Sequence, residues 1–390
     1  MKKQVCLLGG EVIPNVIGAL YERPEAVLPI ATEKTAPQAE FLRQALRACG
    51  FNGAVEEPAI VLPYDEQDCV SVISKTLAGG DCSVNWTGGT KVMAWAARRV
   101  AGEKGLPVLY VNSDENLLLQ GGGKEVPIDT EALGLNVMAW LLASGHTIEG
   151  VETLGDFRRA YQPDRRLVAA ADRIFDLPPE IRYGDVARLS RALDQPASPR
   201  NLSPADVKLL LDAQLIQPAA QPAGSFFLNV ASLSSVYHRD QPQAENAKFL
   251  MATYWEVVVW NLLVKRGGYR DASWHVRLNP RKVGRGAEFD ILLFGNNRFL
   301  VVECKNGVAA GEKISDLIEE TSAKTRRIGR LFSRWILAVN RYREELNVEP
   351  GCLESWAKKA EDYAGTLLFR DDLDELPRIV ETQLNRARML

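Results

Sequence analysis

Short apolar runs alternate with helical patterns over residues 1–145 of this 390-residue chain. The apolar runs are QVCLLGG, AVLPIAT, AIVLPY, CSVNWTGG and LPVLYVNS. Segments between them, such as APQAEFLRQALRACG and TKVMAWAARRVAG, repeat apolar residues at positions i, i+3 and i+4, which is typical of helices that bury one face. Because strand and helix alternate, the sequence predicts an α/β domain with a parallel, doubly wound sheet and helices on both of its faces.

The composition changes after this domain, and Pro and Ala become frequent over residues 146–245. Ser203 as N-cap and Pro204 at the first helical position begin a predicted helix, VKLLLDAQLI follows, and SFFLNV predicts a strand after a Pro/Gly turn. We interpret this region as a helical connector. A winged-helix-like insert is the alternative, although further strand signals are scarce.

A third region begins at residue 246 and reaches residue 390. FLMATYWEVVVWNLLVKRG predicts a buried helix that ends at a Gly pair, and SWHVRLN predicts a strand. A hairpin over 287–307 and a long helix over 311–331 come next, and RWILAVN and GTLLFRDD predict two more strands. The sequence therefore predicts three domains, over residues 1–145, 146–245 and 246–390.

Composition excludes several classes of function. The formal net charge of −3 argues against binding nucleic acid through overall charge, so such contacts need local basic patches. The six cysteines are scattered without a CxxC or Cys/His cluster, which argues against a zinc site and a disulfide framework. The first apolar run ends at Gly9-Gly10-Glu11, too early for a signal peptide, and no run reaches membrane-spanning length. We expect a cytoplasmic protein.

The predicted hairpin AEFDILLFGNNRFLVVECKNG carries charged residues at alternate positions of two apolar strands. If Asn296 and Asn297 form a two-residue turn, Asp290 faces Glu303 and Glu288 faces Lys305, with all four side chains on one face. Directly opposed Cβ atoms are roughly 4.5–5.5 Å apart, so the two carboxylates repel each other unless a cation lies between them. Mg²⁺ or Mn²⁺, which prefer oxygen ligands, are the natural candidates.

The spacing D-x(12)-E-x-K in this hairpin resembles the PD-(D/E)xK nuclease superfamily, which implies a restriction-endonuclease-like α/β domain. The resemblance implies that Asp290 and Glu303 bind the metal and that Lys305 is the catalytic lysine. It also implies that Glu256, in YWEVVVW, is the acidic metal ligand that many such nucleases contribute from their first helix, and that Glu288 is an accessory acid.

A plainer interpretation of the hairpin is a strand pair with surface charges and an ordinary Glu288–Lys305 pair, and Phe289 replaces the usual proline of the motif. Two observations favour a site. The strand FLVVECK is so apolar that its charges would be buried. Basic residues that could contact a phosphate backbone also flank the hairpin: Lys265, Arg266, Arg270, Arg277, Arg281, Lys282, Arg285, Lys324, Arg326, Arg327, Arg330 and Arg334.

In the N-terminal domain, SVNWTGGTKVMAWAA places Gly88 and Gly89 between a strand and a helix. Backbone N–H groups at such a helix start bind anions, and Thr hydroxyls and Lys91 can add to the grip. Gly9-Gly10 and the loop ATEKT follow the first two strands, so they are expected at the same edge of the sheet. Neither a Walker A motif nor GxGxxG is present, which argues against ATP and NAD. The alternative is that Gly serves only tight strand–helix packing.

The string NxTGGTKxM resembles the signature of CARF domains, the Rossmann-like sensors of type III CRISPR systems. With residues 246–390, the chain resembles CRISPR ancillary nucleases that cyclic oligoadenylate activates. The resemblance implies a homodimer that binds cyclic tetra-adenylate across its two-fold axis and then cleaves single-stranded RNA or DNA, or nicks duplex DNA, in antiviral defence. It implies ligand contacts at Gly9, Gly10, Thr32, Asn85, Thr87, Gly88, Gly89, Thr90 and Lys91.

Two other functions are alternatives to a metal-dependent nuclease. A metal-independent ribonuclease needs R-x(4–6)-H on a helix; Arg270 and His275 match the spacing, but WHVRL predicts a strand, so His275 is interpreted as structural. A transcription regulator would combine a winged helix with an inactive C-terminal domain, but VKLLLDAQLI has one lysine and does not resemble a basic recognition helix.

Overall fold

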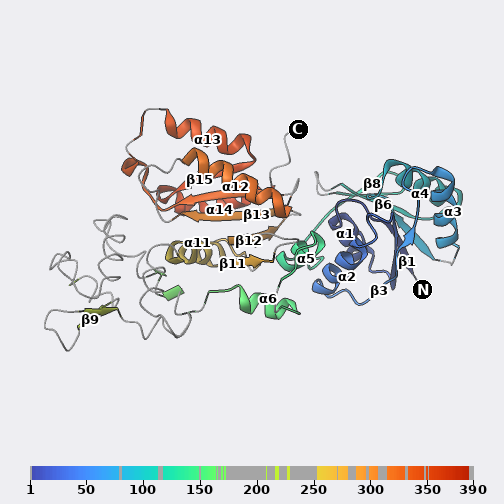
Figure 1. The fold of residues 1–390 in the computed structure, drawn as a ribbon, viewed down its shortest axis with the longest axis horizontal. Coiled ribbons are helices and arrows are strands. Elements are labelled where there is room, and N and C mark those ends of the chain that lie inside the picture. Colours follow the sequence, from blue (N-terminus) through green and yellow to red (C-terminus); the bar gives the residue numbers. More distant parts are fainter. Residues whose placement is uncertain are drawn as a thin grey trace.

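Figure 1 shows the computed structural model, in which two α/β parts, one from each end of the chain, lie side by side. The structure describes residues 2–78, 81–112, 117–148, 151–163, 165, 168–169, 171–172, 208, 216–218, 226–228, 253–269, 271–279, 287–295, 298–305, 314–329, 333–346, 348–349 and 351–385. No helix within these ranges is both long enough and apolar enough to cross a membrane.

The N-terminal sheet has the strand order β3-β2-β1-β5-β6-β7-β8, and β4 pairs with β2. Its strands are β1 (Lys3–Leu7), β2 (Ala26–Ala31), β3 (Ala54–Val55), β4 (Ala59–Ile60), β5 (Cys82–Asn85), β6 (Val108–Asn112), β7 (Leu117–Gln120) and β8 (Lys124–Pro127). All pairs among β1 to β6 are parallel, which confirms the predicted parallel sheet. β7 and β8 extend it as an antiparallel hairpin, which the alternation of strands and helices does not predict.

Helices cover both faces of this sheet, as a doubly wound fold requires. They are α1 (Ile13–Glu22), α2 (Gln38–Ala48), α3 (Glu66–Thr76) and α4 (Lys91–Glu103). α1 and α2 bury their apolar residues in one hydrophobic cluster, and α3 and α4 bury theirs in another. The predicted helices at 36–50 and 90–102 correspond to α2 and α4.

The C-terminal sheet has the order β11-β12-β13-β14-β15. Its elements are α11 (Tyr254–Lys265), β11 (Ser273–Leu278), β12 (Ala287–Gly295), β13 (Arg298–Lys305), α12 (Ile314–Gly329), β14 (Ser333–Val339), α13 (Cys352–Asp362), β15 (Gly365–Phe369) and α14 (Leu376–Asn385). Short 3-10 helices η4 (Arg343–Glu345) and η5 (Arg370–Glu375) follow β14 and β15. α11 and α14 pack on one face of the sheet, and α12 and α13 pack on the other.

The hairpin register agrees with the prediction from the Asn296-Asn297 turn. β12 and β13 are antiparallel, and their pairs run from Gly295 opposite Arg298 to Ile291 opposite Val302. β13 then pairs in parallel with β14 on its other side, so this strand is central in the sheet. A central position explains its apolar sequence, because both of its faces are covered.

Between the two parts, β9 (Ile216–Pro218) and β10 (Phe226–Leu228) form an antiparallel pair, and β10 falls within the predicted strand SFFLNV. The helix that is predicted to begin at Ser203 lies outside the described residues, apart from the helical Lys208. Whether this region is a connector or a winged helix stays a prediction.

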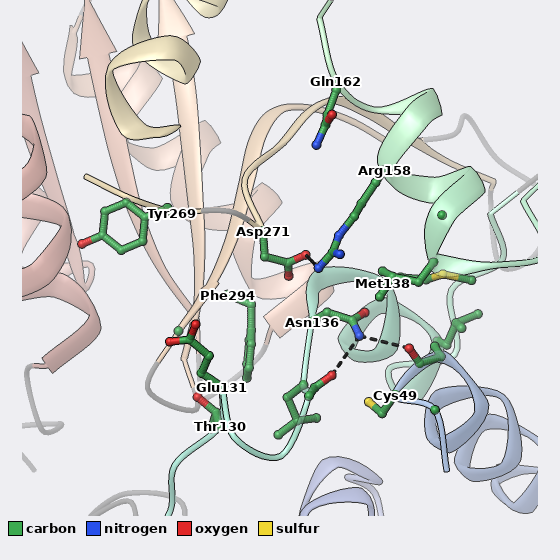
Figure 2. A pocket seen from close by; sticks show the side chains of 18 of the residues that line it. Cys49, Thr130, Glu131, Asn136, Met138, Arg158, Gln162, Tyr269, Asp271 and Phe294 are labelled. Carbon is green, nitrogen blue, oxygen red and sulfur yellow. Dashed lines mark hydrogen bonds and ion pairs between the residues drawn. The ribbon is translucent and has the colours of Figure 1, made fainter. Parts of the chain in front are cut away.

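α5 (Val137–Ala143) connects the two parts of the molecule, and α6 (Leu154–Ala160) follows it. Trp140 of α5 is buried with its ring centroid 5.2 Å from that of Phe294 and 5.7 Å from that of Phe299. One hydrophobic cluster therefore runs from α1 and α2 through α5 to the C-terminal sheet, across the predicted boundary at residue 145. Beside this contact lies a cleft of about 1770 Å³, lined by residues of α2, α5, α6, β12 and α14 (Figure 2).

Asp271 also lies at this junction (Figure 2). Its carboxylate accepts a hydrogen bond from the backbone N–H of Val137, at the start of α5, and its Oδ1 lies 3.6 Å from Nη2 of Arg158 in α6. Burial raises the pKa of Asp271 to about 6, although the Val137 N–H and Arg158 act in the opposite direction.

We expect the difference in melting temperature between wild type and Asp271→Asn to change as pH rises from about 4 to about 6. In this range Asp271 is ionised in the unfolded chain but still protonated in the folded one, so unfolding releases a proton and the wild type loses stability as pH rises. A shift of about two pKa units corresponds to roughly 3 kcal/mol. Thermal melts of both proteins at pH 4.5 and pH 7 test this, and a constant difference contradicts it.

Candidate functional site

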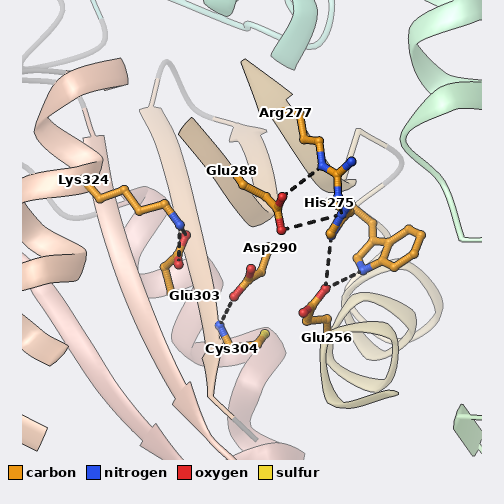
Figure 3. A network of polar contacts seen from close by, with 9 residues as sticks. Glu256, His275, Arg277, Glu288, Asp290, Glu303, Cys304 and Lys324 are labelled. Carbon is orange, nitrogen blue, oxygen red and sulfur yellow. Dashed lines mark hydrogen bonds and ion pairs between the residues drawn. The ribbon is translucent and has the colours of Figure 1, made fainter. Parts of the chain in front are cut away.

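Asp290 and Glu303 lie just beyond the last pair of the β12–β13 ladder (Figure 3). The Asp290 carboxylate accepts a hydrogen bond of 2.7 Å from the backbone N–H of Cys304. Its pKa is raised well above its usual value, first by burial and then by the negative charges of Glu303 and Glu256. The structure therefore brings three predicted acidic residues into electrostatic contact in a buried place.

Glu303 is 5% exposed, and its carboxylate is held by a lysine from the neighbouring helix (Figure 3). Nζ of Lys324, in α12, lies 2.6 Å from both carboxylate oxygens and 4.9 Å from the centroid of the Phe289 ring. Burial raises the pKa of Glu303, and the positive charges of Lys324 and Lys305 oppose that rise. The burial predicted for the charges of FLVVECK is confirmed for Glu303.

Glu256 reaches the same region from the buried helix α11. Its Oε2 accepts a hydrogen bond of 3.1 Å from Nε1 of Trp274 and lies 3.7 Å from Nδ1 of His275. Both partners belong to β11, so the first helix and the first strand of the C-terminal part meet at this carboxylate. Glu256 thus lies beside Asp290, and its role as a metal ligand stays a prediction.

The prediction that all four charged residues of the hairpin share one face is wrong for Glu288. Glu288 pairs with Arg277 of β11, and Nε of Arg277 donates to its Oε2 at 2.9 Å. Phe289 packs in the hydrophobic cluster that includes α12 (the α12 cluster), whereas Ile291, two residues further, packs in the cluster that includes α11 and α14 (the α11 cluster). Because residues two apart in a regular strand share a face, the strand changes face between them. Glu288 lies on the α11 side, away from the side on which Lys324 holds Glu303.

His275, which the sequence suggests is only structural, is part of this constellation (Figure 3). It lies in β11 and not in a helix, so the helical setting of the metal-independent ribonuclease motif is absent here. Its Nε2 lies 2.9 Å from Nη2 of Arg277 and 3.6 Å from Oε1 of Glu288. Lys324 likewise appears in the sequence only as one of many flanking basic residues. Others of those residues form ion pairs elsewhere: Lys265 with Asp172 and Arg266 with Asp374.

The chemistry of the site fits a divalent cation, although its side chains are occupied by protein partners. Within the described ranges, no three His, Cys, Asp or Glu side chains stand ready to hold an ion together. Lys324 and the Cys304 N–H instead supply positive charge and a donor to Glu303 and Asp290. The carboxylate oxygens of Asp290, Glu303 and Glu256 are nonetheless ligands of the kind that suits Mg²⁺ or Mn²⁺.

The glycine loops of the N-terminal part meet at the carboxyl ends of β1 and β5. A Cβ on Gly88 would lie 2.0 Å from the carbonyl oxygen of Leu7, and one on Gly9 would lie 2.9 Å from the backbone nitrogen of Gly89. Gly89 has a φ of 76° and precedes Thr90, the N-cap of α4. Close packing of the two loops therefore requires glycine, and the loops gather at one edge as predicted.

Some side chains of the predicted ligand-binding loops form hydrogen bonds that hold the loops themselves in place. Asn85 is fully buried: its Nδ2 donates to the Pro14 carbonyl, and its Oδ1 accepts from the N–H and hydroxyl of Thr87. The Thr87 hydroxyl oxygen accepts from the Val111 N–H. Asn85 thus fixes the shape of this loop, and its direct contact with a ligand stays a prediction.

The remaining predicted contacts lie nearer the surface. The Thr90 hydroxyl donates to the Pro63 carbonyl at 2.6 Å, while Gly10 and Lys91 are exposed. Thr32, after β2, is mostly buried, and its hydroxyl is 3.2 Å from that of Thr35. Asn15 of α1 is not among the predicted residues. Its Nδ2 donates to the Leu7 carbonyl at the end of β1, so it helps to hold the loop that follows this strand.

No protein-family model matches the sequence, and neither does any curated protein. Solved structures do resemble it. Can2 from Sulfobacillus thermosulfidooxidans, in complex with cyclic tetra-adenylate, has a TM-score of 0.72 at 19% identity, covering 99% of this chain and 100% of Can2. Protein VC1899 from Vibrio cholerae has a TM-score of 0.69 at 14% identity, covering 98% of each chain.

A third similar structure is a type III CRISPR defence DNA nuclease activated by cyclic oligoadenylate. Its TM-score is 0.55 at 15% identity, covering 96% of this chain and 51% of that one. At these identities the likeness is one of fold. It confirms the expected α/β architecture.

Proposed function

We propose that this protein is a metal-dependent nuclease that cyclic tetra-adenylate activates in type III CRISPR antiviral defence. The observation that carries the nuclease part is the buried group of Asp290, Glu303 and Glu256 at the end of the β12–β13 ladder. The likeness in fold to Can2, whose structure contains cyclic tetra-adenylate, supports the second part.

Asp290, Glu303 and Glu256 are the residues that would hold Mg²⁺ or Mn²⁺. A bound divalent cation lowers the pKa of water and neutralises charge on a phosphodiester, which is the chemistry that hydrolysis requires. Lys324 lies 2.6 Å from both oxygens of Glu303, so an ion would either use the lone pairs that remain on this carboxylate or take the place of the lysine. Lys305 would orient the attacking water or stabilise the negative charge that develops on the phosphate.

The N-terminal loops would bind the cyclic ligand. Gly9, Gly88 and Gly89 bring backbone of β1 and β5 to the start of α4, a 13-residue helix whose N-terminal N–H groups suit a phosphate. Lys91, exposed in the first turn, adds positive charge. Gly10, Thr32, Thr87 and Thr90 complete the proposed contacts.

A homodimer is the assembly that we propose for this sensor. Large apolar side chains are exposed next to the ligand loops, with Tyr64 80% and Trp95 52% accessible, and Ile60 and Leu62 exposed beside them. The Thr90 hydroxyl donates to the carbonyl of Pro63, so it connects the loop that carries Leu62 and Tyr64 to the start of α4. A clustered apolar surface of this kind is typical of a protein–protein contact.

A cleavage assay tests the proposal. Labelled single-stranded RNA, single-stranded DNA and plasmid are incubated with Mn²⁺ or EDTA, with and without cyclic oligoadenylates of several ring sizes. We expect cleavage only when metal and cyclic tetra-adenylate are both present. Lys305→Ala should reduce the rate by about 10²–10³-fold, because a positioned cationic group is lost from the transition state.

Lys359→Ala is the matched control. Lys359 lies in α13, and its ammonium contacts Ser315 and Glu319 of α12. Equal cleavage without the cyclic ligand contradicts allosteric activation. Activity that survives in EDTA and disappears in His275→Ala would instead support the metal-independent ribonuclease.

A further inference from the structure

His275 interrupts an otherwise regular strand opposite Asp290. β11 pairs with β12 on both sides of this position, through Ser273/Leu292, Trp274/Ile291, Val276/Phe289, Arg277/Glu288 and Leu278/Ala287. The register is the same on both sides, so neither strand contains an inserted residue and the irregularity is not a bulge. It arises from the backbone of His275, which has a φ of 54°, a left-handed conformation that few non-glycine residues adopt.

The left-handed residue changes the faces to which its neighbours point. Trp274 packs in the α11 cluster, whereas Val276 packs in the α12 cluster, although residues two apart in a regular strand share a face. The side chains of consecutive residues in a strand normally point to opposite faces, but those of Trp274 and His275 lie close together. The rings of Trp274 and His275 are 5.3 Å apart, and both approach Oε2 of Glu256, at 3.1 Å and 3.7 Å.

Arg277 fixes the tautomer of His275. Its Nη2 lies 2.9 Å from Nε2 of His275, and a guanidinium group can only donate. Nε2 must therefore accept, and the ring proton is on Nδ1, which faces Glu256. Glu288 in turn accepts from Nε of Arg277 at 2.9 Å, so a chain of contacts orients the imidazole (Figure 3).

The Nδ1 atom of His275 is buried and has no hydrogen-bond partner within the described part of the chain. Its nearest acceptor is Oε2 of Glu256, at 3.7 Å, only a little beyond hydrogen-bond distance. A small rotation of the Glu256 carboxylate would satisfy this buried donor.

We propose that His275 is a positioning residue that holds Glu256 in the orientation in which it binds the divalent cation. Trp274 and His275 both lie next to Oε2 of Glu256, so together they would restrict the rotation of this carboxylate. The inference rests on the proposed function, since it assigns a purpose to Glu256 at that site. Groups that orient metal-binding carboxylates typically contribute 10–100-fold to metal affinity.

The test is a calorimetric titration of Mn²⁺ into the full-length protein without nucleic acid. His275→Gly retains the left-handed backbone but loses the ring, and it should raise the Kd for Mn²⁺ about 10-fold or more. His275→Asn tolerates the same backbone and supplies an N–H donor, so it should recover part of that loss. The melting temperature of the metal-free His275→Gly protein should not fall, which separates lost positioning from lost packing.

Ala364→Gly is the matched control, because Ala364 also has a left-handed φ, of 63°, and lies after α13. It should leave the Kd for Mn²⁺ unchanged. A wild-type Kd in His275→Gly overturns the inference. If that variant does not fold, Arg277→Met, which frees the imidazole, should raise the Kd a few-fold, and an unchanged value overturns the inference equally.

Failure of the inference and failure of the proposed function give different results. If wild type binds Mn²⁺ and Asp290→Asn does not, while His275→Gly binds as wild type does, only the role of His275 is refuted. If wild-type protein does not bind Mn²⁺ at all, both proposals fail.

Discussion

Replacing Asp290 with asparagine is expected to abolish cleavage and, at the same time, to raise the melting temperature of the protein. Loss of a metal-binding carboxylate removes several kcal/mol of transition-state stabilisation, which corresponds to at least about 10³-fold in rate. Stability should rise because burial, Glu303 and Glu256 all disfavour the ionised form of Asp290 in the folded protein, whereas a neutral amide has no such cost. The amide oxygen can still accept the Cys304 N–H.

Rates with cyclic tetra-adenylate and Mn²⁺, and thermal melts without metal, measure the two effects. Asp374→Asn is the matched control, because this exposed carboxylate pairs with Arg266 at the surface. It should leave the rate unchanged and the stability within about 0.5 kcal/mol. An Asp290→Asn protein that melts lower than wild type would show that the carboxylate stabilises the fold, contrary to the electrostatics described above.

Replacing Gly88 with alanine should abolish activation by the cyclic ligand. Its Cβ would lie 2.0 Å from the Leu7 carbonyl, so the loops after β1 and β5 must separate. Overpacking of this kind typically costs about 1–3 kcal/mol of stability, and here it also displaces the backbone at the start of α4. Calorimetric binding of cyclic tetra-adenylate and the melting temperature measure the two consequences.

Gly102→Ala is the control for this change. A Cβ on Gly102, near the end of the same helix α4, would meet no atom within 4 Å, so the variant should bind the ligand and be as stable as wild type or more so. Normal ligand binding by Gly88→Ala would show that the glycines are needed for packing alone.

The parts of the structure that follow from local sequence were predictable. The hairpin register was predicted from the Asn296-Asn297 pair and the apolar residues on either side of it, and the pairs from Gly295/Arg298 to Ile291/Val302 agree with it. The burial of Glu303 follows from the apolar run around it, which only a central strand can accommodate. The gathering of Gly9 and Gly88 follows from the parallel arrangement of their strands.

The parts that depend on contacts between distant segments were not predictable. Nothing in SWHVRLN indicates that its histidine takes a left-handed conformation, or that it lies opposite Asp290. That placement sends Glu288 to the α11 side and brings Arg277 to it. Lys324 reaches Glu303 because α12 folds back over the sheet, and residue spacing alone does not fix that direction. The residue types and their spacing thus predicted the acidic residues, whereas the partners of these residues could be found only in the folded structure.

The stacking of Trp140 has a mechanical consequence. Trp140 contacts the hairpin at Phe294 and Phe299, beside its turn, and the carboxylates of Asp290 and Glu303 lie four residues further along each strand. At about 3.4 Å per residue, the two ends of this hairpin segment are roughly 14 Å apart. A movement of α5 against the C-terminal sheet must therefore either unstack Trp140 or carry the hairpin with it. The paired strands β12 and β13, which Trp140 contacts at Phe294 and Phe299, thus connect α5 to the acidic residues.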